Sequence, residues 1–237
     1  MKNKVFTKLF ILASTLTFAQ SNGANYEILS KEASTKLFTD SLNSQLGITY
    51  PILRVYKCKD KSGQFFIVLT ESNDTIVSKN DTLHYKVKAL NFLQTKSGLV
   101  KKWEMNDFIS KQTSNDEIEN SIWFWTKYSE FTDLDNDGFI DPLLVYGTSG
   151  INQTSDGRIK ILIYYKGQKF GIRHQNGVLD FERNTRVDKG FYTLPVQIQD
   201  RIKLIMKKIT DDGNGIFPYG WQKAMKERKL YFDENTK

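Results

Sequence analysis

The sequence contains a single cysteine, Cys58, among 237 residues. A lone cysteine excludes a disulfide within the chain, so stability must come from packing or from bound metal. Cys58 ends an alternating run that begins at Val55, and such alternation is typical of a strand. A catalytic thiol needs a nearby base, whereas the two histidines, His84 and His174, lie far away in sequence. We therefore interpret Cys58 as a structural strand residue.

Long hydrophobic runs are also scarce. The run Leu9–Ala19 has 11 residues, whereas a membrane span needs about 20. It follows a lysine-rich start and ends in Thr17-Phe18-Ala19, which places small residues where a signal peptidase requires them. We interpret residues 1–19 as a signal peptide and expect export to the periplasm, cell surface or extracellular space, with no transmembrane segment. The alternative is a buried amino-terminal helix.

A strong charge of one sign is absent. The formal net charge of +7 includes three lysines of the predicted signal peptide, and without them the excess falls to about +4. So small an excess, spread along the chain, argues against a nucleic-acid partner. It leaves open a weak attraction to acidic glycans or lipid head groups.

Several enzyme fingerprints are missing as well. The chain has no GxSxG, HExxH, phosphate-binding loop or dinucleotide-binding pattern. These patterns mark α/β-hydrolases, zinc proteases, P-loop NTPases and Rossmann dehydrogenases. The sequence therefore offers no motif for any of these classes.

What the chain has in quantity is aromatic residues, at 13%. Short alternating apolar runs separated by Gly, Asp and Asn turns predict antiparallel β-structure. Two hairpins are expected in the first half, each around a Lys-Ser-Gly turn. One joins 54–60 to 64–71, and the other joins 83–94 to 99–105.

In the second half, residues 121–131 (SIWFWTKYSEF) read as one aromatic strand leading into an acidic loop. Beyond that loop, a strand is expected at 142–147 and a hairpin at 158–165 and 168–173. Trp123 and Trp125 would share one strand face, with apolar residues on the other. Two apolar faces favour a buried central strand over an exposed platform that stacks on sugars.

Helices are expected near both ends of the mature chain. Ser30–Leu46 reads as one helix stopped by Gly47, and isoleucines at 198, 202, 205 and 209 form the core-facing stripe of another. The second helix should start near Pro195 and end at Asp211-Asp212-Gly213. A shorter helix is expected at 220–228, followed by a polar tail.

Together these patterns predict an α+β fold with antiparallel, β-rich sheets and carboxyl-terminal helices. Residues 20–110 would form an amino-terminal unit of helix and β-hairpins. Residues 121–237 would form calcium-loop hairpins followed by the helices. The polar segment 106–120 separates the two units, although one continuous domain is also compatible with the sequence.

The acidic loop DLDNDGFID carries carboxylates at Asp133, Asp135, Asp137 and Asp141, with glycine at its sixth position. Calcium prefers several oxygen ligands around one point, and the glycine allows the sharp turn that brings them together. We predict a calcium site formed by these four side chains and the carbonyl of Phe139. The alternative is a tight polar turn. An EF-hand is excluded, because its twelfth position holds leucine and its flanks read as strands.

The span from DLDNDGFIDPLLVYGTSG to DGRIKILIYYKGQKF resembles a single FG-GAP or VCBS-type repeat, the calcium-loop hairpin of integrin-like β-propellers and many exported bacterial proteins. The resemblance covers residues 131–170 and implies the same calcium ligands, with a Leu-Leu-Val strand packed in a blade. A full propeller is not expected, because DxDxDG does not recur.

The carboxyl-terminal half, from DGRIKILIYYKGQKF through RHQNGVLDFERNTRVDKGFY to IFPYGWQ, more faintly resembles exported Gram-negative proteins loosely labelled as surface-polysaccharide biosynthesis factors. This resemblance implies an envelope setting and a glycan or envelope partner, and it carries no residue roles.

A second charged segment spans 173–189. Asp180 and Glu182 could act as the paired acid and base of a glycoside hydrolase, with His174 as a base. Arg183 or Arg186 could hold an anionic sugar or phosphate. The alternative is a set of surface salt bridges and caps. From sequence we therefore expect an exported calcium-binding, non-enzymatic envelope or cell-surface protein, for which the fainter resemblance implies an accessory role to surface polysaccharide. The competing hypothesis is an enzyme that acts on surface polysaccharide through 174–188.

Overall fold

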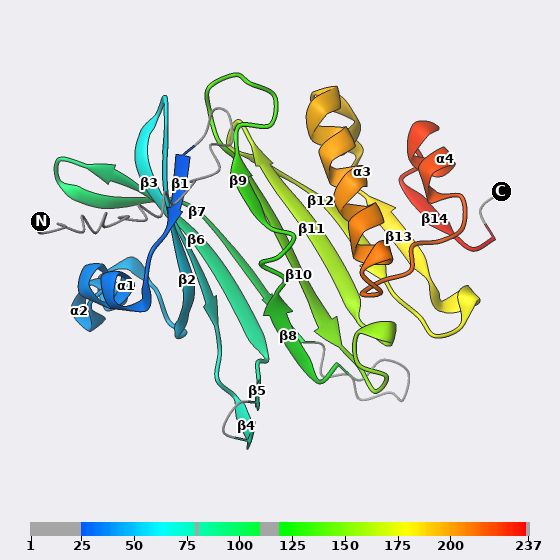
Figure 1. The fold of residues 1–237 in the computed structure, drawn as a ribbon, viewed down its shortest axis with the longest axis horizontal. Coiled ribbons are helices and arrows are strands. Elements are labelled where there is room, and N and C mark those ends of the chain that lie inside the picture. Colours follow the sequence, from blue (N-terminus) through cyan, green and yellow to red (C-terminus); the bar gives the residue numbers. More distant parts are fainter. Residues whose placement is uncertain (1–24, 79–80, 110–118, 236–237) are drawn as a thin grey trace, which may run out of the picture.

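The computed structural model describes residues 25–78, 81–109 and 119–235. The predicted signal peptide lies outside these residues. Two antiparallel sheets share one core, and helices cover their two outer faces, so the described chain forms four layers (Figure 1). This arrangement confirms the predicted α+β, β-rich class, and the sheets of the described residues do not form a propeller.

The first sheet contains five strands and confirms both predicted amino-terminal hairpins. Its spatial order is β1-β2-β3-β6-β7, with every pair antiparallel. Its strands are β1 (Asn25–Ile28), β2 (Ile52–Asp60), β3 (Gly63–Glu71), β6 (Lys86–Thr95) and β7 (Gly98–Phe108), and a separate hairpin pairs β4 (Thr75–Ser78) with β5 (Asp81–Leu83).

The prediction of one strand over 83–94 was wrong, because the chain leaves β5 before it enters β6. At this break the amides of Tyr85 and Lys86 donate to the Ser72 hydroxyl. The backbone therefore bonds to a side chain here instead of continuing a ladder.

The second sheet has seven strands. Six of them follow the order β14-β13-β12-β11-β10-β8, and the seventh, β9, pairs with β10 beside this path. The predicted hairpin at β11 and β12 is confirmed, and its Lys166-Gly167 turn has positive φ at both residues (48° and 78°), as a type I′ turn requires. The strands are β8 (Ser121–Phe124), β9 (Glu130–Thr132), β10 (Asp141–Ser149), β11 (Arg158–Tyr165), β12 (Gln168–Gln175), β13 (Asn184–Val187) and β14 (Tyr231–Asp233).

Two strand predictions for this half need correction. The aromatic segment 121–131 is two strands, β8 and β9, separated by a turn in which the Tyr128 amide donates to the Trp125 carbonyl. The expected polar tail contains β14, which pairs with β13 through Thr185 and Phe232. Phe232 is buried, so this short strand is held by packing as well as by its ladder.

The amino-terminal helix is also divided. The chain forms α1 (Lys31–Leu37) and α2 (Asp40–Leu46) because Thr39 accepts a hydrogen bond from the Leu42 amide and so caps a new helix. Gly47 ends α2 in the left-handed conformation, as predicted.

At the other end α3 (Val196–Asp211) and α4 (Trp221–Lys226) confirm the two predicted carboxyl-terminal helices. The described residues also form three short 3₁₀ helices, at η1 (Thr154–Asp156), η2 (Asp180–Glu182) and η3 (Lys189–Thr193).

Strand alternation sorts the apolar residues into three cores. Phe66 and Val68 of β3 face α1 and α2, whereas Phe65 and Ile67 face the second sheet. The outer face of the second sheet packs against the isoleucine stripe of α3. Because the middle core draws on both halves of the chain, the two sheets bury their inner faces against each other.

Cys58 lies on β2 in this middle core, which confirms its assignment to a strand. Burial raises the pKa of its thiol to about 12. The thiolate needed for nucleophilic chemistry is therefore disfavoured.

No helix among the described residues is both long and apolar enough to cross a bilayer.

Candidate metal site and the neighbouring charged segment

The acidic loop connects β9 to β10, which pair antiparallel from Thr132 and Asp141 onward. Its backbone turns through positive φ at Asn136 (63°) and Gly138 (91°). Asparagine and glycine tolerate this region better than other residues. The loop is therefore a closed turn between two strands, as the DNDG spacing predicts.

Three carboxylates converge inside this turn. Oxygens of Asp133, Asp135 and Asp141 all lie within 4.8 Å of one another. Asp133 and Asp135 are half-buried and Asp141 is 2% exposed. A single cation placed among them could contact all three side chains.

Backbone amides hold these carboxylates in place. Asp133 accepts from the amides of Asp137 (3.1 Å) and Gly138 (2.7 Å). Asp141 accepts from the Leu134 amide at 2.9 Å. The turn therefore aims the two carboxylates inward through its own peptide groups.

Asp135 has a partner from outside the loop. The hydroxyl of Tyr165, at the end of β11, donates to its Oδ2 at 2.9 Å. Sequence reasoning missed Tyr165, because no local pattern connects it to a residue 30 positions earlier.

Asp137 is placed differently from the other three carboxylates. Its Oδ1 accepts from the Phe139 amide at 3.0 Å, and its Oδ2 lies 3.3 Å from the Lys166 ammonium. It is not a member of the converging group. Its assignment as a ligand, and that of the Phe139 carbonyl, both remain predictions from the sequence.

Electrostatics in the cluster are unfavourable for three ionised groups. Burial raises the pKa of Asp141 to about 7, and the nearby charges of Asp135, Asp137 and Asp133 add to the increase. The hydrogen bond from Leu134 acts in the opposite direction. A divalent cation at this position would offset both the burial and the repulsion.

The β2–β3 turn of the first sheet anchors the loop from the other side. The Ile140 amide donates to Asp60 Oδ2 at 3.0 Å, and the Lys61 amide donates to the Gly138 carbonyl at 3.1 Å. The Lys61 ammonium also donates to the Asp137 carbonyl at 2.6 Å. Sequence reasoning missed these contacts, because Asp60 lies 80 positions from Ile140.

The charged segment at 174–188 does not gather its residues around one point. His174 is 2% exposed, its ring lies 4.4 Å from that of Phe217, and its Nδ1 lies 2.9 Å from the Thr185 hydroxyl. Burial lowers its pKa to about 4. His174 is thus a neutral core residue near neutral pH.

Arg183 is also occupied within the fold. Its guanidinium donates to the carbonyls of Gly177 (2.9 Å) and Val178 (3.1 Å) and to the carboxylate of Asp180 (2.7 Å). It also donates to Glu234 at 3.3 Å. Arg183 therefore joins the loop before β13 to the end of β14.

The remaining charged groups of this segment lie on the surface or in local caps. The Asp180 side chain is 79% exposed. Glu182 accepts from the Leu179 amide at 2.9 Å, and Asp188 pairs with Arg173 at 2.6 Å. Arg186 is exposed, with its guanidinium 5.9 Å from the centre of the Tyr231 ring.

Trp123 and Trp125 pack against the core and do not form an exposed platform. Trp125 is buried in the core beneath α3, and Trp123 packs against the same core. The predicted strand is not central, since β8 ends the sheet order. Its edge is covered by the segment between β5 and β6 and by β3. The Ile122 amide donates to the His84 carbonyl, and the Phe124 amide donates to the Glu71 carboxylate, both at 2.8 Å.

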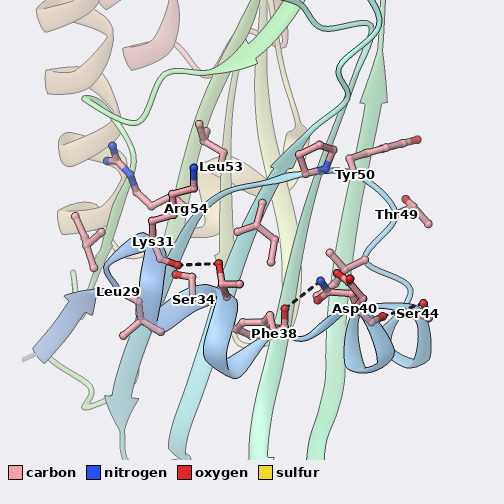
Figure 2. Close-up of a pocket in the computed structure, with 16 residues that line it drawn as sticks. Leu29, Lys31, Ser34, Phe38, Asp40, Ser44, Thr49, Tyr50, Leu53 and Arg54 are labelled. Carbon is pink, nitrogen blue, oxygen red and sulfur yellow. Dashed lines mark hydrogen bonds between the residues drawn. The ribbon is translucent and has the colours of Figure 1, made fainter.

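A cavity of about 730 Å³ lies where α1 and α2 meet the segment before β2. Figure 2 shows Arg54 and Lys31 on one side of it and Tyr50 and Thr49 on the other. None of the side chains that the sequence suggested for catalysis or metal binding lines this cavity.

The chain matches no protein-family model, no curated protein and no solved structure.

Proposed function

We propose that the loop at 133–141 binds one calcium ion, and that the protein is an exported, non-enzymatic component of the cell envelope or cell surface. The observation that carries the proposal is the convergence of Asp133, Asp135 and Asp141 within 4.8 Å. Like charges held this close are costly unless a cation lies between them. The loop brings three carboxylates together, whereas a polar turn needs only one or two polar side chains.

Calcium fits this set better than zinc or magnesium. The cluster offers oxygen atoms only, and histidine or thiolate ligands are what zinc prefers. Magnesium demands a near-ideal octahedron, whereas calcium accepts irregular oxygen sets with six to eight ligands. The carboxylate of Asp137 and the carbonyl of Phe139 would join the three converging side chains, with water completing the shell.

Bound calcium would cross-link parts of the fold that are distant in sequence. The loop joins β9 to β10 and is tied to the β2–β3 turn of the first sheet through Asp60 and Lys61. An ion that fixes the loop therefore also fixes one contact between the two sheets. In a chain with a single cysteine, metal supplies the cross-link that a disulfide cannot.

The envelope setting rests on the predicted signal peptide and on the resemblances stated above. They support a glycan or another envelope component as the partner, with the protein in an accessory role to surface polysaccharide. An enzyme acting through 174–188 has less support, because His174 and Arg183 are committed to the core and to backbone carbonyls.

The test is thermal unfolding of the mature protein in excess calcium and in chelator. A site that exists only in the folded state stabilises it by about 2.7 kcal/mol at one hundred times the dissociation constant. Asp135→Asn should abolish this shift. In chelator the same variant should unfold no lower than wild type, since it removes a charge from the repelling cluster and keeps an oxygen for Tyr165.

Asp180→Asn is the matched control, because it removes an exposed carboxylate from the other charged segment. It should retain the full calcium response. An equal midpoint for wild type in calcium and in chelator would reduce the loop to a polar turn.

A further inference from the structure

The cavity of about 730 Å³ beside α1 and α2 lies where the first sheet has an open edge. β1 pairs with β2 only as far as Tyr56, and the Leu29 amide adds one bond, to the Val55 carbonyl at 3.0 Å. Before that point, Ile52–Arg54 of β2 adjoins β3 on one side and no strand of the described residues on the other. Ile52–Arg54 lines the cavity. The cavity therefore adjoins a strand edge that β1 leaves uncovered.

The chain immediately before β2 adds further open peptide groups. The backbone N–H and C=O groups of Thr49 and Tyr50 bond to no described residue. Tyr50 precedes Pro51, and a residue before proline favours extended backbone. All three residues line the cavity (Figure 2). Unpaired groups along an extended segment are what a peptide pairs with when it adds a strand to a sheet.

A serine in the helical wall has a hydroxyl without a partner. Ser34 lies in the middle of α1, is 8% exposed and lines the cavity. Hydroxyls in helices commonly bond to the carbonyl four residues earlier, as those of Thr35 and Ser44 do, both at 2.9 Å. The Ser34 hydroxyl bonds to no described residue. Its oxygen is not fully enclosed, so an occupant of the cavity can supply the bond.

Charged residues of opposite sign lie on opposite sides of the cavity. Figure 2 shows Lys31 on one side and Asp40 on the other. Both are exposed, and neither forms an ion pair with a described residue. Arg54 also borders the cavity, but its guanidinium lies 3.5 Å from the hydroxyl of Tyr56, which belongs to the middle core on the other face of the sheet. The wall therefore suits an occupant with an anionic end near Lys31 and a cationic end near Asp40.

The positions of these two charges indicate the length of the occupant. Lys31 begins α1 and Asp40 begins α2, and the seven residues of α1 span about 10 Å. Three residues of extended chain also span about 10 Å. Phe38 and Ile48, from the core beneath the helices, give the cavity an apolar surface. Its volume lies within the range of small-molecule sites, about 300–1,000 Å³.

We propose that this cavity binds a short extended peptide with free termini, about three residues long. Its backbone would pair with the open edge at 49–54, its carboxylate would lie near Lys31 and its ammonium near Asp40. An apolar side chain would pack on Phe38 and Ile48, and Ser34 would bond to a peptide group. A neutral sugar has no charged ends for Lys31 and Asp40. The proposal uses no residue of the calcium cluster and requires no metal.

The experiment titrates the tripeptide Ala-Leu-Ala into the mature protein by isothermal titration calorimetry in calcium-containing buffer. We expect one saturable site. N-acetylation removes the cationic end of the peptide and C-terminal amidation removes its anionic end. Each should weaken binding about threefold to fivefold, as for a partly exposed ion pair. Methylation of the leucine amide nitrogen removes a backbone donor and should weaken binding about fivefold.

Charge variants assign the two ends of the peptide. Asp40→Asn should bind the free and N-acetylated peptides equally, and Lys31→Gln should bind the free and amidated peptides equally. Glu32→Gln and Lys36→Gln, at exposed positions of α1 that do not line the cavity, should keep both differences. A terminal preference that survives its own variant would overturn the proposal.

A variant of the helical wall tests the cavity itself. Ser34→Leu should fill it and abolish binding, with the folded state checked by its melting transition. If that variant fails to fold, Ser34→Ala should weaken binding of the tripeptide about fivefold, because it removes one hydrogen-bonding group. Unsaturable binding, or binding that these substitutions leave unchanged, would contradict a peptide site between the helices and β2.

Competition separates a peptide from a glycan. Maltose at the same concentration should not displace the tripeptide. Displacement by maltose, or saturable binding of maltose without binding of the tripeptide, would assign the cavity to glycans and overturn its assignment to peptides.

Discussion

The acidic loop at 133–141 and the charged segment at 174–188 are both dense in ionisable residues, yet the fold treats them in opposite ways. In the loop, charges of one sign share a closed turn, and backbone amides aim three carboxylates at one point. In the other segment, charges of both signs follow a strand and a 3₁₀ turn, and each reaches a separate partner. A closed turn brings charged side chains of one sign together, whereas an extended strand points successive side chains to opposite faces and keeps them apart.

The largest effect is expected from removing Arg183, the buried cation of the charged segment at 174–188. Arg183→Ala leaves Oε1 of Glu234 and two carbonyls without the guanidinium that donates to them. Breaking one partner of such a buried network should cost about 4 kcal/mol in the free energy of unfolding, measured by denaturant titration. Arg186→Ala, at an exposed position nearby, should change it by about 0.5 kcal/mol or less. Equal losses would show that Arg183 is not an anchor.

His174 should make the same segment sensitive to acid. Its folded pKa is lowered to about 4 by burial, so the unfolded chain binds the proton first as pH falls below about 6.5. Above that pH the free energy of unfolding does not depend on the protonation of His174. Between about pH 6.5 and pH 4 it falls by about 3 kcal/mol, because only the unfolded chain takes up the proton.

Asp141 and Glu71, whose pKa values are raised mainly by burial, shift the pH dependence in the opposite direction. The measurement is therefore the difference in unfolding free energy between wild type and His174→Gln at each pH. A difference that stays constant from pH 7 to pH 4.5 would show that His174 is not held neutral.

The loop should depend on its turn even without metal. Gly138 has φ of +91°, and a β-carbon there would collide with the Lys61 side chain. Gly138→Ala in chelator should destabilise the protein by about 2 kcal/mol through backbone strain and the displaced lysine. Gly47→Ala has a positive φ but open space around it, so it should cost less. The melting midpoints of the two variants are compared. Equal decreases would show that the collision with Lys61 does not contribute to the cost of Gly138→Ala.

The smallest effect is expected at Glu182, the residue proposed from sequence as half of an acid–base pair. Its carboxylate accepts from the Leu179 amide, and glutamine can accept the same bond. Glu182→Gln should change the unfolding free energy by about 0.5 kcal/mol or less. A larger loss would mean that this segment is more constrained than its exposure indicates.

Periodicity predicted the elements that depend on their own side chains. The isoleucine stripe of α3, the Lys166-Gly167 turn and the β2–β3 hairpin all followed from local pattern. Errors occurred where a side chain interrupts a pattern. Thr39 divides one helix into two, and Ser72 diverts the backbone between β5 and β6.

For the candidate site, the sequence specified the turn and its carboxylates, because a DxDxDG spacing and one glycine are properties of nine consecutive residues. Only the tertiary structure decided that Asp141 is buried, that Asp137 turns to Lys166, and that Asp60 and Tyr165 hold the loop. These features depend on strands that are distant in sequence and meet only when the apolar faces of both sheets are buried together.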